Sequence, residues 1–193
     1  YYPNISIQED EFLKIKSDWL IKNKDRDLIE EYLIKNQIFN LHPSLIRYLV
    51  DQYLSEANIT KACEIFTKNT EVINDEYLSK FNLYCLINAE RSEEAQLIFD
   101  LKKELGFNDI FFEKKFNLLM GYDIDYKKEI SDKTILNFHL SHKVDPDFSY
   151  SPDENTPKNI WRYLSSSNLL EKIDTIDLEN EKKIKIIEKA THE

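Results

Sequence analysis

Two stretches in the middle of the chain, ANITKACEIF at 57–66 and AERSEEAQLIF at 89–99, decide the fold. Each begins with a small residue, continues through a short polar turn and ends on the pattern Ala-x-x-x-Phe. This pattern uses Ala62 and Phe66 in the first stretch and Ala95 and Phe99 in the second, so both residues recur after 33 positions. We interpret the two stretches as one structural unit that occurs twice.

The apolar residues before each stretch recur as well, with a shift of 32. Leu49 pairs with Phe81 and Tyr53 with Cys85, so we expect the second turn to be one residue longer than the first. A helix pair that recurs at this spacing is typical of a solenoid, because one helical hairpin cannot bury its apolar face alone and neighbours must stack. The sequence therefore predicts one all-α domain over residues 1–193 with a repeat core at 43–105. A non-repetitive helical bundle is the alternative.

At these positions the chain resembles the tetratricopeptide repeat family, whose first helix carries apolar residues and a tyrosine and whose second carries Ala-x-x-x-Phe. The matching residues are Leu49, Tyr53, Ala62 and Phe66 in one copy and Phe81, Ala95 and Phe99 in the next. Val50 and Asn82 replace the family's glycine, and its proline is missing from both copies. The resemblance implies a right-handed α-α array with irregular terminal helices.

Helical periodicity also dominates outside the repeat core. The expected helices are 9–22, 25–35, 43 onward, 59–68, 75–88, 93–105, 109–120, 134–143, 157–165 and 178–190. Asn74 and Asn108 are the expected N-caps of the fifth and seventh, and Gly106 and Gly121 are expected to end helices. Phe12, Ile15 and Trp19 form the apolar stripe of the first helix.

Turn residues fill 144–156, which we predict to be a long loop. Its aromatic residues Phe148 and Tyr150 are expected to fold back on the helices, because two such side chains disfavour free exposure. The segment 157–193 is expected to hold C-terminal helices and to belong to a longer chain or to a processed one, since the sequence starts at Tyr1 rather than at Met.

Composition excludes several classes of function. The net charge is −10, which disfavours binding to a phosphate backbone, so we expect no nucleic-acid partner. Two glycines are too few for a glycine-rich nucleotide loop. No apolar run in the chain approaches the roughly 20 residues that span a bilayer, so no transmembrane segment is expected. A cytoplasmic and an exported location both remain open.

No catalytic or cofactor motif emerges from the sequence. His139 and His142 lie three positions apart near Asp145, but no further ligand follows at a recognisable spacing, so we interpret them as ordinary histidines and expect no metal or cofactor. Neither cysteine belongs to a Cys-x-x-Cys pair, and no serine has the setting of a nucleophile.

The leading hypothesis is therefore a non-enzymatic module that binds a protein or a peptide. The repeat resemblance implies a concave surface lined by the first helix of each pair, with these candidate contact residues: Arg47, Asp51, Leu54, Ser79, Leu83 and Leu86. A structural domain of a longer polypeptide is the second hypothesis, and an uncharacterised helical enzyme is the third.

The repeat register also predicts that Cys63 and Cys85 lie at one level of two antiparallel helices. Their Cα atoms should then be within about 7 Å, a distance that a disulfide can bridge. Both a disulfide and two buried free thiols fit this geometry, and the choice depends on whether the compartment is oxidising.

Overall fold

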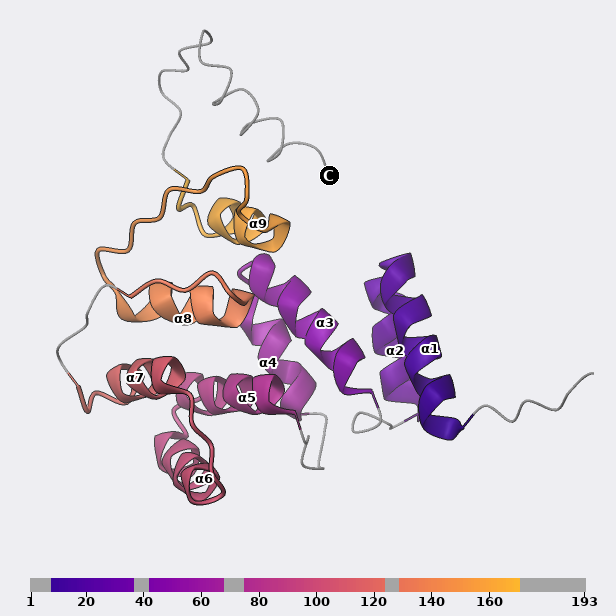
Figure 1. Ribbon diagram of the computed structural model, residues 1–193, viewed down its shortest axis with the longest axis horizontal. Helices are drawn as coiled ribbons and strands as arrows, with labels where there is room; N and C mark the ends of the chain where they lie inside the picture. Colours follow the sequence, from indigo (N-terminus) through magenta and orange to yellow (C-terminus); the bar gives the residue numbers. More distant parts are fainter. Residues whose placement is uncertain (1–7, 37–41, 68–74, 124–128, 171–193) are drawn as a thin grey trace, which may run out of the picture.

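The computed structural model describes residues 8–36, 42–67, 75–123 and 129–170 (Figure 1). These ranges contain helices and no strand. The helices are α1 (Glu9–Asn23), α2 (Arg26–Asn36), α3 (Pro43–Ser55), α4 (Ile59–Thr67), α5 (Glu76–Asn88), α6 (Ser92–Glu104), α7 (Ile110–Leu119), α8 (Ile135–Val144) and α9 (Lys158–Ser166). The all-α prediction is confirmed for the described part of the chain. The helix expected at 178–190 lies outside it.

Side-chain caps begin α5, α7 and α8, with two corrections to the expected caps. Asp75, not Asn74, caps α5 by accepting a hydrogen bond from Leu78 N at 2.8 Å, and Asp109, not Asn108, caps α7. In both cases an aspartate follows the asparagine, and the later residue is the one whose oxygen reaches the first free N–H groups. The helix ends at Gly106 and Gly121 agree with the prediction, since both glycines have a positive φ.

The α3–α4 and α5–α6 hairpins share the same turn. Each has three residues between its helices. Ala57 and Glu90 adopt a left-handed conformation at equivalent places, and the next N–H returns to the carbonyl of Tyr53 or Leu86 at 2.9 Å. The prediction of a longer second turn is therefore wrong. The hairpin boundaries follow a shift of 33, whereas the buried residues of α3 and α5 follow a shift of 32.

Helix α3 lies at the centre of the molecule. It packs against α1, α4, α5, α8 and α9 (Figure 1). Seven of its residues are buried, including Ile46, Leu49 and Val50. The chain reaches α9 after α5, α6, α7 and α8, and α9 then returns to α3, so the last described helix closes on an early one.

The loop after α8 folds back on the helices, as expected. The Phe148 ring lies 5.4 Å from the Phe138 ring between centroids, and the Tyr150 ring lies 4.9 Å from it. The Tyr150 hydroxyl also donates to Asp132 at 3.0 Å. The loop is therefore part of the packed structure around α8.

The expected stripe of α1 lies on its outer face. Phe12, Ile15 and Trp19 are 53%, 53% and 59% exposed. The helix instead turns Ser17 and Leu20 inward, where both are buried. Helical spacing places Phe12, Ile15 and Trp19 along one side of α1, but the side that packs against the rest of the molecule is the one with Ser17 and Leu20.

Candidate functional site

The surface that the repeat resemblance implied is largely buried. Leu54 and Leu83 are fully buried and Leu86 nearly so. Helices α8 and α9 pack on α3, and the ring of His139 in α8 meets Tyr84 of α5 at 4.9 Å. The apolar residues of α8 and α9 belong to the same packed core as these leucines. In this structure the three leucines contribute to the core and not to an open groove.

Two polar members of the predicted set, Arg47 and Asp51 of α3, contact Tyr77 of α5. The Tyr77 hydroxyl donates a hydrogen bond to Asp51, and the Arg47 guanidinium lies 4.3 Å from the centre of the Tyr77 ring. Burial raises the pKa of Asp51 to about 6, although Tyr77 and Arg47 both favour its charged form. Ser79 is half-buried on α5. Of the six predicted residues, only Arg47 is exposed.

An open cleft of about 860 Å³ lies elsewhere, between α1, α2, α3 and α9. Its lining residues are mainly long and charged, and the cationic ones are Lys22, Lys24, Arg26 and Arg162. Among the described residues that line it, Glu56 is the one carboxylate. The lining set thus has an excess of positive charge on a chain whose net charge is −10.

Short local structures bring these cations together. Helix α1 is followed by a left-handed residue, Lys24, and α2 begins at Arg26, so this tight connection places three cations within the five residues of the segment KNKDR. Arg162 comes from α9 and donates from Nη1 to Gln52 Oε1 at 2.8 Å. The basic segment is visible in the sequence, but its meeting with Arg162 depends on the packing of α9 against α3.

The exposed row of α1 leads toward this cleft. Trp19 and Lys22 are three positions apart and therefore neighbours on the helix surface. Lys22 lines the cleft, while Phe12, Ile15 and Trp19 continue along the outer face of α1. The apolar row of α1 could be found from the sequence, whereas the cleft could not. The position of the row next to the cleft is therefore known only from the structure.

The two histidines considered as metal ligands meet a tyrosine. The Tyr163 hydroxyl lies 2.8 Å from Nδ1 of His139 and 2.7 Å from Nδ1 of His142. A hydroxyl carries one proton, so it donates to one imidazole and accepts from the other. Burial lowers the pKa of His139 to about 3, and burial also lowers the pKa of His142. Within the described ranges, no group of three or more His, Cys, Asp or Glu residues could hold a metal ion.

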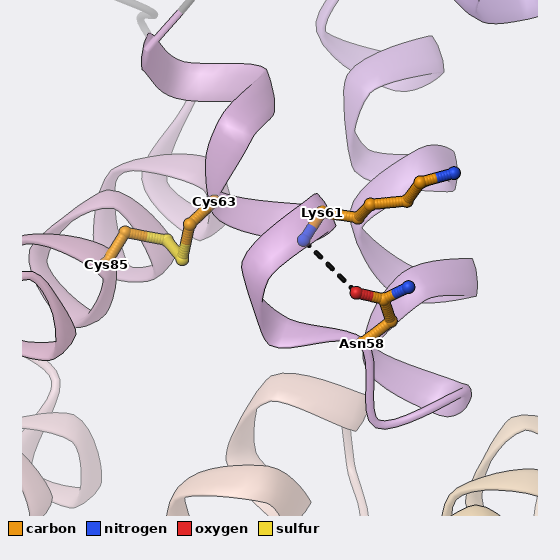
Figure 2. The surroundings of a disulfide bond; sticks show 4 residues. All are labelled: Asn58, Lys61, Cys63 and Cys85. Atoms are coloured by element: carbon orange, nitrogen blue, oxygen red, sulfur yellow. Dashed lines mark hydrogen bonds between the residues drawn. A yellow bond between two sulfur atoms is a disulfide. The ribbon is translucent and has the colours of Figure 1, made fainter.

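Cys63 and Cys85 form a disulfide that joins α4 to α5 (Figure 2). Their Cα atoms lie 5.5 Å apart, within the distance that the repeat register predicted. Of the two alternatives that the sequence left open, the structure contains the bonded one. The bond closes a loop between residues 22 positions apart.

Comparisons with known proteins identify no relative. No protein-family model matches the chain, and no curated protein or solved structure matches it significantly. No helix in the described ranges is long and apolar enough to cross a membrane. Function must therefore be inferred from the surface features themselves.

Proposed function

We propose that this protein is a non-enzymatic interaction module that binds a protein partner through the outer face of α1. The observation that carries this proposal is the exposed row of Phe12, Ile15 and Trp19. Contiguous exposed apolar side chains mark interaction sites more often than single ones do. Tryptophan is also among the residues that contribute most to binding energy at interfaces.

The spacing of the row indicates how a partner would bind. Positions 12, 15 and 19 follow the helical period, so the three side chains project along one line. A partner that offers an apolar groove or an amphipathic helix would match this line. Trp19 is the natural anchor, since it has the largest side chain of the three.

Selection from a displayed peptide library would test the proposal, because it samples many candidate partners at once. The immobilised full chain is compared with Trp19→Asp and with Leu101→Asp, a control at a 51% exposed leucine on α6. We expect peptides that are enriched on the wild type and on Leu101→Asp but not on Trp19→Asp. Equal enrichment on all three proteins would exclude α1 as the binding face, provided that circular dichroism shows each variant to be folded.

The second candidate, a structural domain of a longer polypeptide, is favoured by a different surface. Leu97, Leu101 and Leu105 of the α6 region are 62%, 51% and 88% exposed, and Ile110 follows at 65%. Helix α6 lies at the edge of the molecule (Figure 1), where a further helix could pack. Under this hypothesis Leu101→Asp destabilises a longer natural chain but changes the stability of this chain by less than about 0.5 kcal/mol.

A further inference from the structure

The charge of the α1–α2–α3–α9 cleft opposes that of the chain. Four cations line it against Glu56 alone among its described lining residues; Arg26 is paired with Glu56, and Lys22 and Lys24 supply two further positive charges at the cleft beside Arg162. Like charges brought together repel unless something neutralises them. Such an arrangement therefore favours a ligand with two or more negative charges.

Two of the cations are held in place by contacts with α3. Arg26 Nη1 donates to Glu56 Oε2 at 2.6 Å, and its guanidinium lies 5.6 Å from the centre of the Tyr53 ring. Arg162 is held by its bond to Gln52. A guanidinium offers five N–H donors in a planar fork that matches a carboxylate. Because both groups are already oriented, a ligand would lose less entropy in ordering them.

The size of the cleft suits a ligand larger than a single ion. Its volume of about 860 Å³ falls in the range of sites that hold drug-sized molecules. Tyr48 and Ile21 add apolar wall to the charged lining. The site thus offers contacts to both charged and apolar side chains of one ligand.

We infer that this cleft binds an acidic segment of the protein partner, next to the apolar contact made by Trp19. The inference rests on the proposed function, because Lys22 joins the cleft to the α1 row. A protein segment is favoured over a nucleic acid since the net charge of −10 repels a long polyanion, whereas a short acidic segment meets chiefly the local positive field.

The test uses two fluorescein-labelled peptides and the full chain. One peptide alternates glutamate and leucine and ends in phenylalanine, and its twin has glutamine in place of each glutamate. Fluorescence anisotropy should show the acidic peptide binding at least about tenfold more tightly at low salt, with the difference shrinking as salt is added. Arg26→Gln and Arg162→Gln should each weaken the acidic peptide by about tenfold and leave its twin unchanged.

Two control variants accompany the peptide-binding experiment. Lys133→Gln removes an exposed cation that does not line the cleft, so it should change neither affinity. Arg26→Lys keeps the charge and loses the planar fork, so it should retain part of the preference for the acidic peptide.

The outcomes separate this inference from the proposed function. Equal binding of both peptides, abolished by Trp19→Asp, would overturn the acidic cleft and leave the α1 face intact. Loss of acidic binding in the arginine variants but not in Trp19→Asp would support the cleft and overturn the α1 face. Binding of tripolyphosphate without binding of the acidic peptide would show a phosphate site and overturn the inference, as would binding of neither ligand.

Discussion

The centre of the molecule and its N-terminal helix pair differ in how many buried apolar residues each contributes to the core. In the centre, α3, α4 and α5 share a continuous apolar core and a disulfide. The α1–α2 pair joins the same core through few buried apolar residues, namely Leu20, Ile29 and Leu33 among those described, and polar contacts with α3 and its N-cap add to this attachment. The α1–α2 pair, which carries the proposed binding face, therefore has fewer buried apolar residues than the centre. This agrees with the general finding that binding regions come from the less stable parts of a fold.

His42 connects the α1–α2 pair to α3 by hydrogen bonds. Its Nδ1 lies 2.8 Å from the Ser17 hydroxyl of α1, and its Nε2 lies 3.0 Å from the Tyr32 hydroxyl of α2. His42 itself occupies the N-cap position of α3 and is buried. One imidazole therefore connects three helices, and burial, followed by the nearby Lys16, lowers its pKa.

The largest expected effect comes from the apolar centre. Phe81 is fully buried, and its ring lies 5.5 Å from the Phe66 ring between centroids. Phe81→Ala should lower the free energy of unfolding by about 3–5 kcal/mol in urea denaturation, because it leaves a cavity. Phe12→Ala, the matched change on α1, should cost less than about 0.5 kcal/mol. Comparable losses would contradict the contrast between the two regions.

The disulfide should contribute slightly less than the core aromatic. Replacing both Cys63 and Cys85 by serine should lower the free energy of unfolding by about 3 kcal/mol, because the unfolded chain regains the freedom of the closed loop. Hydrogen exchange would show which helices are affected. Protection in α4 and α5 should fall, whereas local opening of α1 should keep its rate. A faster opening of α1 alone would show that the two regions are not separate units.

Removal of the His42 tie should act on the N-terminal pair first. His42→Ala removes the contact of the imidazole with the buried Ser17 hydroxyl, and an unsatisfied buried polar group costs about 1–3 kcal/mol. Hydrogen exchange should accelerate in α1 and α2 while α5 stays protected. Lys35→Gln, which removes an exposed ion pair with Glu31 on α2, is the control and should leave exchange unchanged.

The smallest predicted effect depends on pH and acts outside the N-terminal pair. Because the folded pKa of His139 is lowered to about 3 from 6.5, its stabilising contribution is complete above pH 6.5 and is lost as pH falls below that value. Between pH 7.5 and 5.5 this loss amounts to about 1.4 kcal/mol. His139→Gln should therefore lose that much less stability than the wild type over the same interval, measured by urea denaturation.

Asp51 changes the free energy of unfolding with pH in the direction opposite to His139. Its pKa is raised to about 6, so the stability associated with its proton grows as pH falls through that value. This contribution is common to the wild type and to His139→Gln and cancels in their difference. A steeper loss in the variant would contradict the assignment of a neutral, buried His139.

The local features could be predicted from the sequence, but the packing of α9 against α3 could not. Helix periodicity, the glycine helix ends and the Cys63–Cys85 proximity each depend on residues near in sequence or in adjacent helices, where spacing determines geometry. The position of Phe148 and Tyr150 followed from their chemistry, since large aromatic side chains seek partners.

The candidate surfaces could not be predicted in the same way. Leu54 and Leu83 have the same pattern whether a foreign peptide or other helices of the chain cover them. Likewise, Trp19 belongs to a regular apolar stripe whether that stripe faces the core or solvent. Side-chain period identifies an apolar face, but only the packing of distant helices decides what it meets.

The closure of α9 onto α3 also affects how the chain folds during its synthesis. In an open array each helix pair can fold as it leaves the ribosome, because it needs only its neighbours. Here Gln52 requires Arg162, 110 residues later in the chain, so α3 cannot complete its contacts until nearly all of the described chain has been made. Contacts this distant slow folding and leave the buried leucines of α3 and α5 exposed on the nascent chain, where chaperones would be expected to bind.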